Sequence, residues 1–240
     1  MNNAALRRAG AAVLVMIAIT AGVWLHSAGG PASRSSSVGI RVPAGESSAP
    51  NPSDDGPVGS APLTAGAIPA SSIPARLPAF ALGDRNGKLT SIEEYAGKSL
   101  VLNFWATWCA PCRREIPLLQ SLHRQWSGSR IQVIGIAVDY PEKVREFADN
   151  LKISYPLLIG EQDALDVAAS LGVSSPVFPF TVFTDRRGEV VALFVGEMRR
   201  PQAEVILSIV RTLDQGGLSL GQARQEVSRG LKGLQPEPTP

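Results

Sequence analysis

The segment NFWATWCAPCRREIP, residues 103–117, constrains the fold of this 240-residue chain more than any other part. It holds both cysteines of the chain, Cys109 and Cys112, separated by two residues. It overlaps SLVLNFWA (99–106), a continuous apolar run of strand length that is typical of a strand buried on both faces of a sheet. The residues after Cys109 are predicted to form a helix to about Trp126. The cysteine pair is therefore expected where a buried strand gives way to a helix.

Strand and helix patterns alternate on both sides of this segment. Short apolar or alternating runs bounded by turn residues predict strands, and apolar residues three and four positions apart predict helices. Strands are predicted in 80–90 (two strands around a turn), 99–106, 131–139, 180–185 and 189–195, with 155–160 as a strand or a loop. Helices are predicted at 91–98, 109–126, 141–152, 163–172 and 200–213. This alternation predicts an α/β fold with a mixed central sheet, an antiparallel edge and helices on both faces.

The N-terminus has the pattern of a targeting segment. Arg7 and Arg8 precede AGAAVLVMIAITAGVWL (9–25), which carries no charge and has no polar face. Its length is at the short end for crossing a bilayer. Arginines before the segment predict a cytoplasmic N-terminus and an external remainder. We expect residues 1–26 to be a retained single-pass anchor in the inner (cytoplasmic) membrane, with the domain in the periplasm or extracytoplasmic space. A cleaved signal peptide is the alternative.

The rest of the chain divides into three parts. Residues 27–78 are crowded with Ser, Pro, Ala and Gly and contain no aromatic residue, so we expect a disordered linker. The folded domain is expected at 79–213. Residues 214–240 are expected to form a tail with a weak helix at 218–231. The net charge of +2 is mixed along the chain without a basic stripe, so nucleic-acid binding has no support.

The cysteine pair has three possible uses: a metal site, a structural bridge or redox chemistry. Zinc needs four ligands, or three and a water. The chain has no second CxxC; one histidine, His26, borders the apolar segment, and the other, His123, lies about 16 Å along the predicted helix. We therefore expect no metal. A disulfide that closes so short a ring adds little stability, which leaves redox chemistry.

The predicted position of the pair suits that chemistry. A helix N-terminus offers unpaired N–H groups and a partial positive charge, and both stabilise the thiolate of Cys109. Cys112, one turn further, can resolve a mixed disulfide. Pro111 is tolerated in the first helical turn. Trp108 is expected at the rim of the site, where it contacts substrate. No cofactor is needed, because the disulfide is itself the redox group.

LNFWATWCAPCRREIP resembles the active-site segment of the thioredoxin superfamily. Residues from about 75 to 213 resemble its membrane-anchored TlpA/ResA-like branch, which includes the CcmG/DsbE proteins. The resemblance is carried by the opening FALGDRNGKLTSIEEYAGKSLVLNFWA, by a long middle insertion and by FPFTVFTDRRGEVV. It implies a thioredoxin-like fold with an N-terminal hairpin extension and a middle insertion. It does not cover the linker or the tail.

The resemblance also implies residue roles. Pro179 matches a cis-proline opposite the cysteine pair, and the backbone of Phe178 before it would pair with a bound substrate strand. The dipeptide Ala110-Pro111 between the cysteines is typical of the family and would line the substrate site. Asn103 stands where thioredoxin has a buried aspartate, and its amide cannot shuttle protons.

Glu115 matches a glutamate that this branch often carries three residues after the second cysteine. A carboxylate in a poorly solvated pocket near a thiol can exchange protons with it. We therefore hypothesise that Glu115 assists deprotonation of Cys112. The alternative is a solvated glutamate favoured in the first helical turn by the helix dipole.

Together these observations predict an extracytoplasmic thiol–disulfide oxidoreductase on a membrane tether. The resemblance implies that it reduces client disulfides of the apocytochrome c or copper metallochaperone type, as in cytochrome c biogenesis. It also implies a transmembrane thiol donor of the CcdA/DsbD type. A DsbA-like disulfide donor is the main alternative, and a thiol peroxidase and a non-catalytic binding module remain open.

Overall fold

The computed structural model describes residues 66–68, 72–126, 128–173 and 177–234. The predicted anchor and most of the predicted linker lie outside these residues. Within the described ranges, no helix is both long and apolar enough to cross a bilayer.

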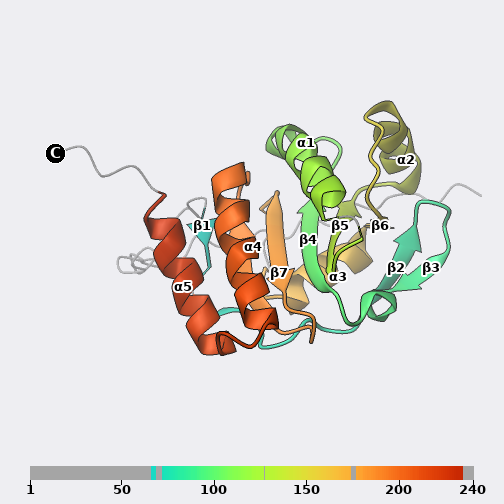
Figure 1. The fold of residues 1–240 in the computed structure, drawn as a ribbon. Coiled ribbons are helices and arrows are strands. Elements are labelled where there is room, and N and C mark those ends of the chain that lie inside the picture. The colour runs from blue at the N-terminus through green and yellow to red at the C-terminus, as the bar shows by residue number, and fades with distance from the viewer. Residues whose placement is uncertain (1–65, 69–71, 127, 174–176, 235–240) are drawn as a thin grey trace, which may run out of the picture. The chain divides into compact units, whose positions relative to one another are not determined.

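One mixed sheet organises the described part of the chain, with strand order β1-β8-β7-β4-β5-β6-β2-β3 (Figure 1). The parallel centre consists of β4 (Ser99–Trp105), β5 (Ile131–Val138) and β6 (Leu157–Gly160). The antiparallel strands are β7 (Phe180–Thr184), β8 (Val190–Val195) and β1 (Gly66–Ala67) on one side, and β2 (Ala81–Asp84) and β3 (Leu89–Ser91) on the other. The expected antiparallel edge is thus confirmed on both sides of a parallel centre.

Among the described residues, five α-helices cover the two faces of this sheet. They are α1 (Ala110–Gln125), α2 (Pro141–Asn150), α3 (Gln162–Ser170), α4 (Arg200–Asp214) and α5 (Leu220–Lys232). In Figure 1, α1, α4 and α5 lie on the near side of the sheet and α3 lies behind it. The predicted helices on both faces are therefore confirmed.

Side chains of the central strand β4 alternate between two apolar cores. Val101 and Trp105 pack with residues of α1, α2, α4 and α5. Leu102 and Phe104 point the other way and pack with residues of α3. Every residue of β4 is buried, which explains why its sequence is a continuous apolar run rather than an alternating one.

Most sequence-based boundaries agree with the structure within a few residues. The predicted hairpin is present as β2 and β3, and the ambiguous segment 155–160 contains the strand β6. The predicted short helix is a 3-10 helix, Ile92–Tyr95. Ser91 caps it and Glu94 bonds back to the Ser91 N–H, as the capping-box pattern requires.

The folded unit extends beyond the predicted limits of 79–213. Before residue 79, β1 pairs with β8, and Ile73 is buried in the α3-side core. After residue 213, α5 is a helix of 13 residues packed on α4, with Ala223, Val227 and Leu231 buried. The predicted linker and tail therefore each contain a folded part. Both additions pack on one side of the domain, near β8.

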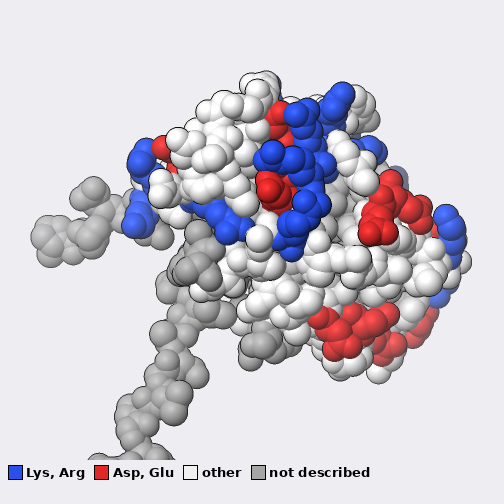
Figure 2. Space-filling view, turned by 90° about the horizontal axis from the view of Figure 1, so that it is seen from below, with Lys and Arg blue, Asp and Glu red and all other residues white. Residues whose placement is uncertain are grey.

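Charged side chains of both signs lie on the face of the domain that is at the bottom of Figure 1. Figure 2 shows a band of lysines and arginines on this face beside separate patches of aspartates and glutamates. This pattern agrees with the near-balanced total of 23 basic and 21 acidic residues in the sequence.

Candidate active site

The cysteines lie where β4 ends and α1 begins, as predicted. Cys109 has an extended backbone and is the N-cap residue of α1, and its Sγ accepts a hydrogen bond from the Cys112 N–H at 3.3 Å. The two residues form a disulfide, with Cα atoms 5.3 Å apart. Pro111 occupies the first helical turn, where its missing N–H leaves no helical hydrogen bond unmade. Cys109 is 5% exposed and Cys112 is 1% exposed, so Cys109 is the more accessible of the two.

Glu115 lies one turn beyond Cys112 and is buried, with 1% of its surface exposed. Its Oε1 accepts a hydrogen bond from Asn103 Nδ2 at 2.6 Å, and its Oε2 accepts one from the Met198 N–H at 3.0 Å. Asn103 Nδ2 also donates to Thr181 Oγ1 at 3.0 Å. The alternative of a solvated first-turn glutamate is therefore wrong, because the chain between β8 and α4 covers this position.

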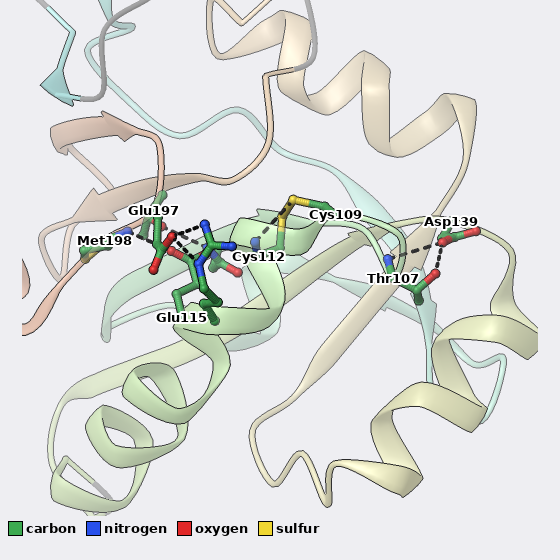
Figure 3. The surroundings of a disulfide bond; sticks show 10 residues. Thr107, Cys109, Cys112, Glu115, Asp139, Glu197 and Met198 are labelled. Carbon is green, nitrogen blue, oxygen red and sulfur yellow. Dashed lines mark hydrogen bonds and ion pairs between the residues drawn. A yellow bond between two sulfur atoms is a disulfide. The ribbon is translucent and has the colours of Figure 1, made fainter.

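The environment of Glu115 changes its acidity. Burial raises the pKa of Glu115 from 4.5 to about 7, although the hydrogen bonds from Met198 and Asn103 oppose this shift. The negative charge of Glu197 contributes to the rise. Glu197 is itself paired at the surface with Arg114 at 2.5 Å (Figure 3). Glu115 can therefore gain or lose a proton near neutral pH. Within the described part of the chain, no hydrogen bond joins its carboxyl to either cysteine.

Asp139 holds the loop that leads from β4 to the cysteines. It follows the last residue of β5 and is 8% exposed. Its Oδ2 accepts the hydroxyl of Thr107 and, at 3.3 Å, the Thr107 N–H (Figure 3). Its Oδ1 accepts the N–H of Tyr140 at 2.9 Å. Asp139 thus joins the loop before Cys109 to the loop before α2.

Trp108, Ala110, Pro111, Phe178 and Pro179 make up what we call the rim of the site, and Phe178 packs against the buried cluster that contains both cysteines. Trp108 is 69% exposed, and its ring lies edge-on to that of Phe178, with centroids 6.1 Å apart. The Phe178–Pro179 peptide bond is cis, as the resemblance implied. Ala110 is exposed and Pro111 is half-buried, so both are accessible at the start of α1. The structure brings Trp108 and Phe178, predicted from distant parts of the sequence, into contact.

Sequence reasoning missed Asp139, Thr107 and the Met198 backbone. A signal for Asp139 was available, because it is the last residue of the predicted buried strand 131–139, and the carboxyl ends of parallel strands meet at one edge of a sheet. No sequence signal pointed to Met198, whose contact with Glu115 joins positions 83 residues apart.

Comparisons with known proteins match this geometry. The model of the AhpC/TSA family matches residues 73–193. Thioredoxin-like protein YneN of Bacillus subtilis is 33% identical over 136 residues, spanning 55% of this chain and 76% of YneN. Thiol-disulfide oxidoreductase ResA of Geobacillus kaustophilus is 31% identical over 135 residues, spanning 56% of this chain and 75% of ResA. The crystal structure of a secreted thiol-disulfide isomerase from Corynebacterium glutamicum has a TM-score of 0.52 and 26% identity, covering 58% of this chain and 85% of the isomerase.

The region matched by the family model contains the strands from β2 to β7, the cysteine pair and the cis-proline, whereas β1 lies outside it. These similarities confirm the thioredoxin-like α/β fold and the resemblance to ResA-like proteins that the sequence indicated. The family match ends at residue 193, so it does not include α5.

Proposed function

We propose, since this chain belongs to the AhpC/TSA family and is a thiol–disulfide oxidoreductase, that it acts outside the cytoplasm as a reductant of client disulfides. The observation that carries this proposal is the pairing of Cys109, 5% exposed at a helix N-terminus, with the more deeply buried Cys112, which is 1% exposed. The nucleophile needs access to a client and a stabilised thiolate, whereas the resolving cysteine needs only to reach the first sulfur.

The proposed reaction starts from the dithiol form. The Cys109 thiolate attacks one sulfur of a client disulfide, the client S–S bond breaks, and a mixed disulfide forms. The Cys112 thiolate then attacks Cys109 Sγ, the mixed disulfide breaks, and the client sulfur leaves as a thiolate that takes up a proton. The Cys109–Cys112 disulfide of the structure is the product. Two electrons have passed from the protein to the client.

Glu115 supplies a proton acceptor for the second step in this proposal. Its pKa of about 7 means that a substantial fraction is ionised at neutral pH. An ionised Glu115 can accept the Cys112 proton, directly or through one water, before Cys112 attacks. Glu115→Gln is expected to slow the release of client thiol from the mixed disulfide. It is also expected to remove the dependence of this release rate on a group that titrates near pH 7. An unchanged pH profile would exclude this role.

The rim provides the proposed client site. In this proposal the Phe178 backbone would pair with an extended client segment, and the Trp108 ring and Ala110-Pro111 would contact its side chains; the cis Phe178–Pro179 bond and the contact between the Trp108 and Phe178 rings support it. Clients of the apocytochrome c or copper metallochaperone type have the required cysteine pairs. A transmembrane thiol donor of the CcdA/DsbD type would return the disulfide to the dithiol. The apolar segment 9–25 would hold the protein at the inner membrane.

The direction of electron flow is tested by the reduction potential of the cysteine pair. The full chain is equilibrated with glutathione or dithiothreitol buffers, and the dithiol fraction is measured by thiol labelling. A potential near that of thioredoxin, about −270 mV, supports a reductant. A potential near about −120 mV would show that the dithiol is the stabilised form. The protein would then be a disulfide donor, and the proposed direction would be wrong.

The roles of the two cysteines are tested by trapping. Cys112→Ser is expected to accumulate a mixed disulfide with a model disulfide protein, whereas Cys109→Ser accumulates none. The reverse pattern would exchange the assigned roles. Peroxide consumption that persists in Cys112→Ser would instead favour a thiol peroxidase, which needs only one attacking cysteine.

A further inference from the structure

The β4–α1 loop before Cys109 is a short turn fixed by few contacts. The Cys109 N–H donates to the Ala106 carbonyl at 3.2 Å, which closes the turn over Thr107 and Trp108. The Thr107 hydroxyl and N–H both bond to Asp139 Oδ2. Trp108, between Thr107 and Cys109, is mostly exposed and cannot hold the turn in place by burial. Asp139 is therefore the main attachment of this turn to the end of β5.

We propose that Asp139 is a positioning residue for Cys109: by holding Thr107, it fixes the turn that sets the Cys109 Sγ at the N-terminus of α1. The carboxylate also accepts the Tyr140 N–H, which anchors it to the loop before α2. In Figure 3, Asp139 and Glu115 lie on opposite sides of the cysteine pair. The two buried carboxyls thus have separate tasks, one for each cysteine. This inference rests on thiol–disulfide exchange at Cys109 and on no particular client or direction.

The chemical benefit of this attachment is the environment of the sulfur. The Sγ of Cys109 accepts the Cys112 N–H at 3.3 Å, and this donor together with the helix N-terminus stabilises a thiolate. If the turn loosens, the sulfur spends less time near these N–H groups and in the geometry for attack, so the reaction slows. A second possibility predicts the opposite effect on the reaction rate. If Asp139 acted on Cys109 only through its negative charge, removing it would favour the thiolate and speed the reaction.

The test measures attack by Cys109 in the full chain with Cys112→Ser, so that one thiol reacts. The reduced protein is mixed with 5,5′-dithiobis(2-nitrobenzoate) at pH 7, and the second-order rate constant is recorded. Asp139→Ala is expected to lower it roughly tenfold. Asp139→Asn is expected to stay within about threefold of the parent, because its amide oxygen can still accept from Thr107 and only the hydrogen bond from the Tyr140 N–H is lost. A rate in Asp139→Ala that is equal to the parent or faster would overturn the proposal. Equal slowing by the Asn and Ala variants would also overturn it.

Two further variants separate positioning from general damage. Thr107→Val removes only the hydrogen bond from the Thr107 hydroxyl to Asp139 and is expected to slow the reaction by about threefold. An unchanged rate contradicts the proposal even if Asp139→Ala fails to fold. Asp84→Ala is the matched control, because Asp84 also fixes a turn, accepting the N–H groups of Asn86 and Lys88, but in the hairpin between β2 and β3. Its rate is expected to equal that of the parent. Reduction potentials of the same Asp139 variants with both cysteines present show whether the dithiol has lost stability. The proposed reductant direction can fail without changing these rates.

Discussion

Glu115 should make this protein less stable as the pH rises from about 4.5 to about 7. The carboxyl is buried and its pKa is raised from 4.5 to about 7. Below pH 4.5 the group is protonated in both the folded and the unfolded protein and contributes no difference. Between 4.5 and 7 the unfolded chain releases the proton while the folded protein keeps it, so the free energy of unfolding falls as pH rises. Above pH 7 the loss is complete and constant.

The size of this loss follows from the two pKa values. A tenfold change in proton affinity is worth about 1.4 kcal/mol, so the rise from 4.5 to about 7 corresponds to roughly 3 kcal/mol. Glu115→Gln removes the titrating group. Its amide NH₂ must face one of the two donors, Asn103 Nδ2 or the Met198 N–H, and this adds a penalty that does not change with pH. The pH dependence therefore isolates the charge, even if the variant is less stable at every pH.

The assay is urea unfolding of the oxidised protein between pH 4.5 and 8.5, followed by circular dichroism. We expect the free energy of unfolding of Glu115→Gln, minus that of the parent, to rise by roughly 3 kcal/mol across this range. Glu204→Gln is a suitable control, because Glu204 is exposed on α4 and its removal should leave the pH dependence unchanged. A difference between parent and Glu115→Gln that stays flat from pH 5 to 8 would refute the reasoning.

Three further substitutions test the packing around the site. Gly135→Ala should lower the free energy of unfolding by about 1–3 kcal/mol, because the new Cβ would lie 2.6 Å from Leu157 Cδ2; urea midpoints equal to the parent would show that the core adapts. Leu231→Ala should cost about 2–5 kcal/mol if α5 is part of the domain, and near zero in the same assay if it is a loose tail. Tyr155→Phe should be neutral or stabilising, because the Tyr155 hydroxyl is buried without a hydrogen-bond partner among the described residues; a loss above about 1.5 kcal/mol would reveal one.

Local sequence patterns were sufficient to predict the elements that carry the cysteines. The apolar run of β4, the proline after Cys109 and the strand-to-helix junction are properties of neighbouring residues. For these elements the physical cause, burial on both faces or the fixed φ of proline, acts within a few residues. Pro179 was assigned instead through the family resemblance, which implied a cis-proline directly before this strand.

Features that depend on distant contacts could not be predicted in the same way. β1 has only two residues, and its pairing with β8 joins segments more than 120 residues apart. The helical pattern of α5 was weak in isolation because its stability comes from packing its buried stripe on α4 and β8. The burial of Glu115 depends on Met198, which reaches it through the turn after β8. The sequence alone was equally compatible with a solvent-exposed Glu115, because the helix dipole also favours an acidic residue in the first helical turn.

The choice of Asn103 beside Glu115 has a physical consequence for the site. An aspartate at position 103 would place two carboxyls in the 2.6 Å contact now made by Nδ2 and Oε1, and the two would share a proton, so that at least one could not ionise near neutral pH. The amide instead donates to Glu115 and favours its ionised form, which limits the rise in pKa that burial causes. The same nitrogen also donates a hydrogen bond to Thr181 Oγ1 at 3.0 Å. Asn103 cannot carry a proton itself. Its hydrogen bond nevertheless helps to keep the pKa of Glu115 near 7, where the Glu115 carboxyl can gain or lose a proton at neutral pH.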